Sequence, residues 1–167
     1  MSEVFRSETY GELELTDIPV KIQEFYERVK NRDGAFQVVV GTDSQNFSDT
    51  KMVTVIAAYK EGCGGIFFYD IDRISRITNV KQKLNAETSR SLEVAMELVG
   101  ELESEVRYKD LRDNALLSIH IDAGWSDKGK TKELIPSLVG WIKACGFEAK
   151  CKPYSFAASS IADKISK

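Results

Sequence analysis

The chain has 167 residues, the usual size of one folded domain. Hydrophobic residues make up 43% of the sequence and charged residues 29%, which excludes a disordered or fibrous chain. The formal net charge of −3 argues against a protein that coats nucleic acid through bulk charge. No apolar run is long enough to cross a bilayer, the N-terminus has no signal-peptide pattern, and the three cysteines lack C-x-x-C spacing. We therefore expect a cytoplasmic protein with reduced thiols and no membrane partner.

The first half of the sequence predicts one helix followed by three strands. Thr16 and Asp17 can cap a helix that ends near residues 31–34, so residues 1–34 are expected to form an N-terminal extension with a helix. Three β-branched or aromatic runs follow, joined by short turns, at 36–45, 51–59 and 65–74. They predict an antiparallel meander.

The second half alternates between helices and strands. Helical patterns cover 84–106, 131–146 and 155–167, and strand patterns cover 115–122 and 147–153. Pro136 is expected in or near the first turn of its helix, because a deeper position costs about 3 kcal/mol. A meander followed by alternation predicts one α/β domain over residues 1–167 with a mixed sheet.

One stretch matches a phosphate-binding motif. From Gly124 to Thr131 the sequence reads G-W-S-D-K-G-K-T, which fits G-x-x-x-x-G-K-[ST]. The residues after it leave no room for the further βα units of a parallel-sheet NTPase. The favoured interpretation is a βα loop with Thr131 or Asp127 as helix cap. The second interpretation is a loop in which Lys130 contacts an anion. An NTPase is the remote alternative.

Four carboxylates carry the chemistry that the sequence indicates. Asp43 and Asp122 end two apolar strands, Glu87 lies in the first turn of the long helix, and Asp163 lies in the final helix. Taken singly, each is more ordinary as a turn, cap or solvated acid. Taken together, they supply the oxygen ligands that Mg²⁺ or Mn²⁺ prefers. Two such ions about 3.5–4 Å apart can activate water and stabilise the leaving oxygen of a phosphodiester.

Three sequence strings, "VVVGTDSQ", "IHIDAG…GKTKELI" and "KPYSFAASSIADK", resemble the YkuK-type ribonuclease H-like proteins. The resemblance covers roughly residues 15–167 and implies a five-stranded mixed sheet flanked by helices. It also implies nuclease activity on RNA, an RNA/DNA hybrid or structured DNA, with Asp43, Glu87, Asp122 and Asp163 as the metal cluster. Glu93 and Glu97, on the same helix as Glu87, stay as alternatives for the helical ligand.

Several basic residues follow the fourth strand. Residues 128–167 hold eight lysines against three acids, and Lys128, Lys130 and Lys132 are candidate phosphate contacts beside Trp125. His120, the only histidine, is expected to be a hydrogen-bonded strand residue more than a neighbour of the metals. The rival hypothesis is a non-catalytic nucleic-acid or protein interaction module of the same fold, in which the acids act as caps and turn formers.

Overall fold

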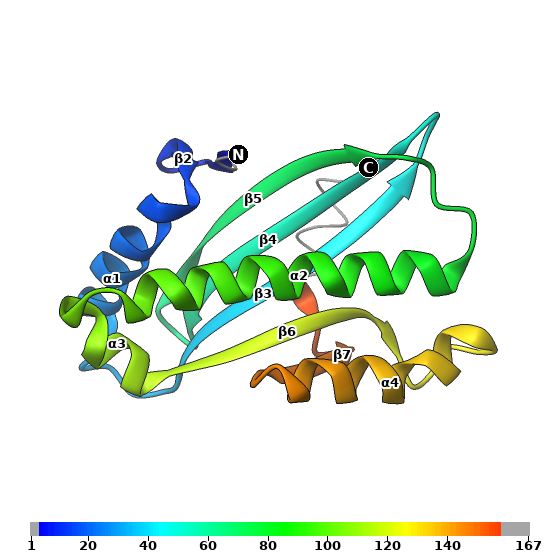
Figure 1. The fold of residues 1–167 in the computed structure, drawn as a ribbon. Coiled ribbons are helices and arrows are strands. Elements are labelled where there is room, and N and C mark those ends of the chain that lie inside the picture. Colours follow the sequence, from blue (N-terminus) through cyan, green and yellow to red (C-terminus); the bar gives the residue numbers. More distant parts are fainter. Residues whose placement is uncertain (1–3, 158–167) are drawn as a thin grey trace.

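The computed structural model describes residues 4–157 of the chain (Figure 1). The strands are β1 (Val4–Ser7), β2 (Gly11–Glu14), β3 (Phe36–Asn46), β4 (Thr50–Lys60), β5 (Gly64–Ile74), β6 (Ala115–Gly124) and β7 (Glu148–Lys152). The helices are α1 (Ile18–Val29), α2 (Val80–Glu103), α3 (Lys109–Asn114) and α4 (Lys130–Ala144), with 3-10 turns at Leu15–Asp17 and Val106–Tyr108. Within these residues, no helix combines the length and the apolar composition needed to cross a membrane.

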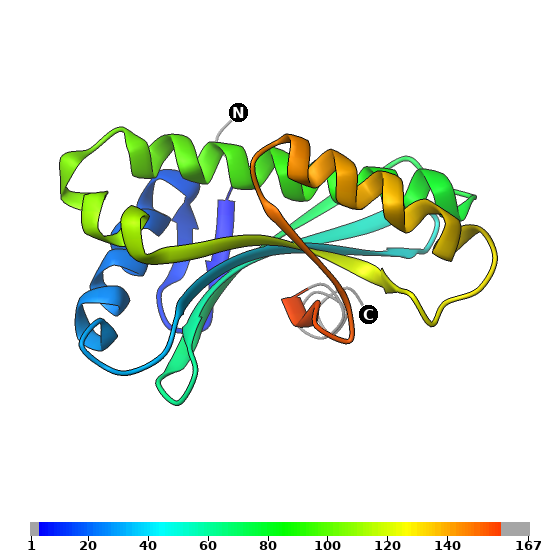
Figure 2. The same ribbon diagram turned by 90° about the horizontal axis from the view of Figure 1, so that it is seen from below.

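The strands form one mixed sheet in the order β2-β1-β5-β4-β3-β6-β7, which confirms the predicted α/β class. β3, β4 and β5 are the predicted antiparallel meander, while β6 runs parallel to β3 and β7 parallel to β6. Figures 1 and 2 show α2 and α4 on the same side of this sheet. The main core lies between these helices and the sheet, with Val38 and Val40 of β3 fully buried in it.

The prediction of five strands was wrong, because the sheet has seven. The two additional strands, β1 and β2, form an antiparallel hairpin in the segment expected to be an extension. β1 joins the edge of the meander at Arg6↔Tyr69, and Phe5 is fully buried there. Strands of four residues with several charged side chains give too short an alternation to be recognised. The six-residue helix α3 was missed for the same reason.

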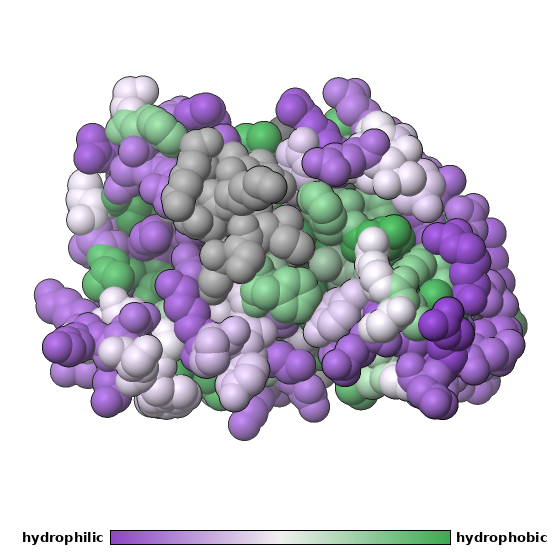
Figure 3. Space-filling model, turned by 180° about the vertical axis from the view of Figure 1, so that it is seen from behind, coloured by the Kyte–Doolittle hydropathy of each residue, from purple (hydrophilic) through white to green (hydrophobic). Residues whose placement is uncertain are grey.

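The opposite face of the sheet carries a second, smaller apolar cluster. Its buried members within the described residues include Val39, Val53 and Val55. After β7 the chain reaches this face, where Ala157 is fully buried (Figure 2). Figure 3 shows hydrophobic side chains in the middle of this face and hydrophilic ones around them. The predicted final helix, 155–167, lies outside the described residues from 158 onward.

Helix α4 differs from the prediction in the place of its proline. The helix begins at Lys130, so Pro136 is its seventh residue and not part of the first turn. Pro136 cannot donate the backbone hydrogen bond of that position. Burial of Ile135, Leu138 and Ile142 against the sheet and α2 offsets this loss.

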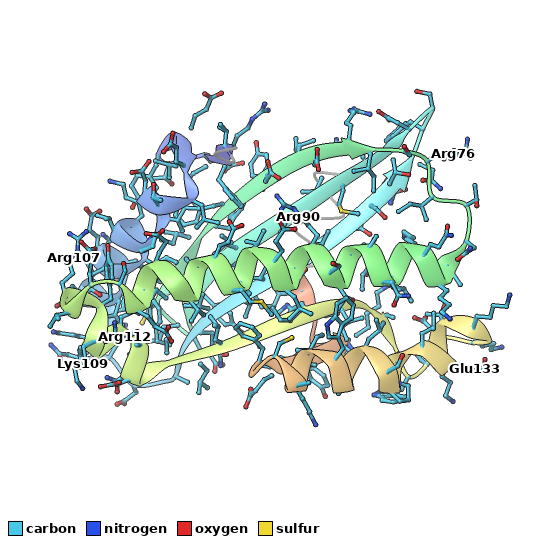
Figure 4. The ribbon with its side chains drawn as sticks, viewed as in Figure 1. Arg76, Arg90, Arg107, Lys109, Arg112 and Glu133 are labelled. Carbon is cyan, nitrogen blue, oxygen red and sulfur yellow. The ribbon has the colours of Figure 1, made fainter. Side chains whose placement is uncertain are left out.

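Polar contacts fix the position of α2 on the sheet. Arg90 Nη2 lies 3.0 Å from Asp70 Oδ2 of β5, and both side chains are largely buried; Figure 4 shows Arg90 on the sheet side of α2. At the next residue of α2, the hydroxyls of Ser91 and Thr42 are hydrogen-bonded at 2.7 Å. These contacts set which residues of α2 face β3.

A buried ammonium group closes α1. Lys60 is only 4% exposed, and its Nζ donates to the carbonyl oxygens of Val29 at 2.9 Å and Arg32 at 2.7 Å. Val29 is the last residue of α1, and Arg32 lies in the turn that follows, where the Arg32 N–H also donates to the Val29 carbonyl at 3.0 Å. The end of β4 therefore supplies the C-terminal cap of α1.

Replacing this cap should destabilise the fold. Lys60→Met should lower the free energy of unfolding by about 2 kcal/mol, because a charged donor to helix-end carbonyls is lost. Urea denaturation measures the change, with Lys128→Met, at an exposed lysine, as the control. Equal stability of the two variants would contradict the capping role.

Candidate functional site

The candidate site lies where the sheet divides. β3 and β6 pair from Phe36↔Ala115 to Gly41↔His120 and no further, and the β6–β7 register is irregular between His120 and Gly124. Asp43 and Asp122 each stand two residues beyond the last β3–β6 pair. β3 itself continues beside β4 to Asn46. Local breaks in pairing of this kind are frequent next to active sites.

Glu87 is brought to the same place by α2. Glu87 was predicted in the first turn of this helix, but it is the eighth residue, because the helix starts earlier, at Val80. Its side chain is 3% exposed, and Ser44 Oγ donates to Glu87 Oε2 at 2.8 Å. Glu87 Oε1 is buried without a hydrogen-bond partner among the described residues. Glu93 and Glu97 are exposed.

Polar contacts at the far end of the meander place the start of α2. Asn46 Nδ2 donates to the carbonyl of Ile77 at 2.7 Å, and Thr50 Oγ1 accepts from the Ile77 N–H at 2.9 Å. Asn79 then caps the helix by accepting from the Gln82 N–H at 2.8 Å. The β3–β4 hairpin thus determines where the first turns of α2 lie.

Two lysines face the carboxylates. Lys83 Nζ lies 4.0 Å from Asp43 Oδ1 and 3.8 Å from Glu87 Oε2, and Lys152 Nζ lies 3.2 Å from Asp122 Oδ1. Burial opposes the charge of Lys152, yet Asp122 and other nearby acids raise its pKa. Within residues 4–157, no three His, Cys, Asp or Glu side chains are gathered closely enough to hold a metal ion. In this arrangement the cations beside the acids come from the chain itself.

The acids nevertheless act on one another. Burial raises the pKa of Glu87 to about 8, and the charges of Asp43 and Asp122 add to the rise, while Lys83 and Ser44 oppose it. Three of the four predicted ligands are therefore close enough to interact electrostatically. The fourth, Asp163, lies outside the described residues.

The donor atoms fit a hard divalent cation. Mg²⁺ and Mn²⁺ take carboxylate oxygens, and the unpartnered Oε1 of Glu87 is a buried acceptor that lacks a donor. Metal binding would require the Lys83 and Lys152 ammonium groups to move away from Asp43, Glu87 and Asp122. Both lysine side chains are partly exposed, at 37% and 43%, so solvent is open to them.

His120 binds the chain that follows β7. The Ala157 N–H donates to His120 Nδ1 at 3.1 Å, and the imidazole packs edge-on against Phe156. Burial, and next the charge of Lys150, lower its pKa to about 4. His120 therefore acts as a neutral acceptor that anchors residues 156 and 157 beside β6.

The loop with the phosphate-binding spelling is closed by its own atoms. The Gly124 N–H is taken by Asp127 Oδ2 at 2.9 Å, and the Asp127 N–H donates to the Gly124 carbonyl at 2.9 Å. α4 follows with Gly129 as its N-terminal cap residue at φ 65° and no capping side chain, so neither Asp127 nor Thr131 caps it as predicted. The three predicted phosphate contacts, Lys128, Lys130 and Lys132, are exposed.

Three side chains of the site were not singled out in the sequence: Ser44, Lys83 and Lys152. Lys83 stands four residues before Glu87, a spacing that brings opposite charges together on a helix. That signal was available. The approach of Lys152 to Asp122 depends on the pairing of β6 with β7, for which the sequence gives no register.

Comparisons with known proteins agree on a family. A family model described as Ribonuclease H-like matches residues 17–167. The "Uncharacterized protein YkuK" of Bacillus subtilis (strain 168) is 28% identical over 183 residues, and the alignment covers the whole of both chains. The chain is thus similar to ribonuclease H-like proteins along nearly all of its length.

Two solved structures share a weaker likeness. Both contain the Mos1 transposase catalytic domain and raltegravir, one with Mn and the other with Mg. They are 12% and 11% identical, with TM-scores of 0.30 and 0.29. Each covers 81% of this chain, which spans 57% and 58% of theirs. TM-scores this low give no information about the site.

Glu87 should make the stability of the metal-free protein depend on pH. Its folded-state pKa of about 8 lies above the ordinary value of 4.5. The stabilising contribution is therefore fully present below pH 4.5 and is lost as the pH rises towards 8. In EDTA, the free energy of unfolding of the wild type should fall by at least about 1.4 kcal/mol as the pH rises, the equivalent of one pKa unit. Glu87→Gln should remove this fall.

Denaturant unfolding at a series of pH values measures this fall. Glu93→Gln, at an exposed acid of the same helix, is the control and should keep the wild-type profile. A Glu87→Gln profile that still falls like that of the wild type would show that the carboxyl of Glu87 is not destabilised by burial.

Proposed function

Because the chain belongs to the ribonuclease H-like family, we propose that it is a divalent-metal-dependent nuclease that hydrolyses phosphodiester bonds of nucleic acid. One observation supports this most: Glu87 is buried beside Asp43 with one carboxylate oxygen unpartnered, where the pairing of β3 and β6 ends. A buried carboxylate without a full set of donors is costly. A cation at this position would remove that cost.

In this proposal Asp43 and Asp122 are the principal shared ligands, and Glu87 and Asp163 complete the two sites. When bound, two Mg²⁺ or Mn²⁺ ions would activate water and stabilise the leaving oxygen. Ser44 orients Glu87 through its 2.8 Å hydrogen bond. Lys83 and Lys152 neutralise the acids in the metal-free protein and, once displaced, are placed to contact phosphate oxygens.

The charge of the site makes metal binding and the approach of the reacting phosphate interdependent. Clustered carboxylates repel a phosphate that comes close to them until cations neutralise them. The proposed partner is RNA, an RNA/DNA hybrid or structured DNA. The proposed location is the cytoplasm, where thiols such as the free Cys63, Cys145 and Cys151 stay reduced.

A non-catalytic interaction module is the second candidate. It is favoured by the pairing of Lys83 with Asp43 and of Lys152 with Asp122, and by the lack of a three-ligand group within residues 4–157. In such a module the lysines would be permanent partners of the acids. Metal affinity separates the two candidates.

Neutralising either aspartate should abolish cleavage. Asp43→Asn and Asp122→Asn should each lower the Mn²⁺-dependent cleavage rate at least about 100-fold, because losing a ligand should cost no less than losing an outer contact. The assay uses labelled single strands, RNA/DNA hybrids and branched DNA, with Asp113→Asn, at an exposed acid of α3, as the control. Activity that persists in EDTA or in both variants would rule out this nuclease.

Removing Lys83 should strengthen metal binding. Lys83→Met deletes an ammonium group that stands within 4.0 Å of two carboxylates and repels a cation. The expected gain in Mn²⁺ affinity is about fivefold, which corresponds to about 1 kcal/mol of lost repulsion. Electron paramagnetic resonance of free Mn²⁺ measures it, with Lys81→Met of the same helix as control. Weaker binding would mean that Lys83 supports the site in another way.

A further inference from the structure

Two exposed aromatic residues line one groove at the outer edge of the sheet. The groove lies between α4 and β7 and has a volume of about 740 Å³. Trp125 and Tyr154 contribute to its wall and are 54% and 74% exposed. Large apolar side chains left in water at one place commonly mark a binding surface.

The backbone holds both aromatic residues in defined places. Trp125 lies in the turn closed by the two Asp127–Gly124 hydrogen bonds. Tyr154 lies in a turn closed by its own N–H, which donates to the Cys151 carbonyl at 2.8 Å. The pairing of Gly124 with Lys152 brings these two turns together. The aromatic side chains are thus presented from two neighbouring strand ends.

The charge of the groove is entirely positive among the described residues. Lys143, Lys150 and Lys152 line it, and none of its described lining residues is an acid. The chain as a whole has a net charge of −3, so this concentration of lysines is a local feature. A positive groove with exposed aromatic faces suits a ligand that combines negative charges with flat apolar rings.

The groove and the carboxylate site share Lys152. Lys152 lines the groove, and its Nζ lies 3.2 Å from Asp122 Oδ1. Trp125 follows Asp122 by only three residues. A chain of nucleotides in the groove would therefore lead towards Asp122.

We propose that this groove binds a single-stranded segment of nucleic acid, with bases stacked on Trp125 and Tyr154 and phosphates on the three lysines, and guides it to the carboxylates. The guiding role rests on the proposed nuclease function. A single strand is favoured over a duplex because the base faces that an aromatic side chain needs are already stacked within a duplex. No base-specific contact is required, so sequence preference should be weak.

Binding is tested with the full-length protein in EDTA, so that cleavage does not interfere. Fluorescence polarisation would follow single-stranded DNA and RNA of about 16 nucleotides, the upper range for one stacking groove. Trp125→Ala and Tyr154→Ala should each weaken binding about tenfold, and Tyr154→Phe should keep it. Lys143→Gln should reduce the slope of log affinity against log salt by about 0.7.

The chain provides a matched control for the aromatic variants. Trp141 is also exposed, at 39%, and lies on α4, but it does not line the groove. Trp141→Ala should bind like the wild type. In Trp141→Phe, where Trp125 is the remaining tryptophan, the oligonucleotide should quench fluorescence; in Trp125→Phe it should not. Thermal melting would establish that the variants are folded.

The two proposals fail in different ways. If Trp125→Ala loses oligonucleotide binding and the wild type cleaves no substrate, the groove proposal is supported and the nuclease proposal is ruled out. If Trp125→Ala and Tyr154→Ala cleave single strands as fast as the wild type, the groove proposal is ruled out and the nuclease proposal stands. Three results would overturn the groove as a single-strand site: both alanine variants bind as tightly as the wild type, the wild type prefers duplex, or the wild type binds no oligonucleotide.

Discussion

The end of the pairing between β3 and β6 is the constraint on which the rest of the site depends. Up to Gly41 and His120 the two strands share backbone hydrogen bonds; beyond them β3 follows β4, while the pairing of β6 with β7 becomes irregular. Side chains just past this point are not fixed by a regular ladder between β3 and β6. Asp43 and Asp122 lie there, and the first turns of α2 bring Lys83 close to Asp43.

Burial of an acid close to two others is the cost of this arrangement. Glu87 is buried, and its pKa is raised by burial first and then by Asp43 and Asp122. A fold selected for stability alone would not keep a carboxylate with an unpartnered oxygen at such a place. Lys83 offsets part of this repulsion from a partly exposed position. In the proposed nuclease, such internal counter-ions would let the protein fold without metal and leave the acids available for it.

Strong local patterns predicted most of the fold, and long-range pairing accounts for what they missed. The meander, α2 and β6 carry long β-branched or helical runs, so they were predicted from their periodicity, and Asp43 and Asp122 were assigned to the correct strands. The hairpin of β1 and β2 is too short for that signal, and its stability comes from burying Phe5 beside β5. The contact of Lys152 with Asp122 needs the β6–β7 register, which is broken by a local irregularity.

The glycine that begins the phosphate-binding spelling has a structural reason of another kind. A Cβ at Gly124 would lie 2.9 Å from the Cβ of Lys152 and 3.1 Å from its carbonyl oxygen, so a larger residue would push β7 away. That close approach sets Lys152 beside Asp122 and also brings the turn of Trp125 next to that of Tyr154. The same backbone contact therefore positions a lysine for the carboxylates and assembles the aromatic groove. The first glycine of the motif is explained by strand packing, and any phosphate bound here would lie along the groove lysines, because the Gly124 N–H is already bonded to Asp127.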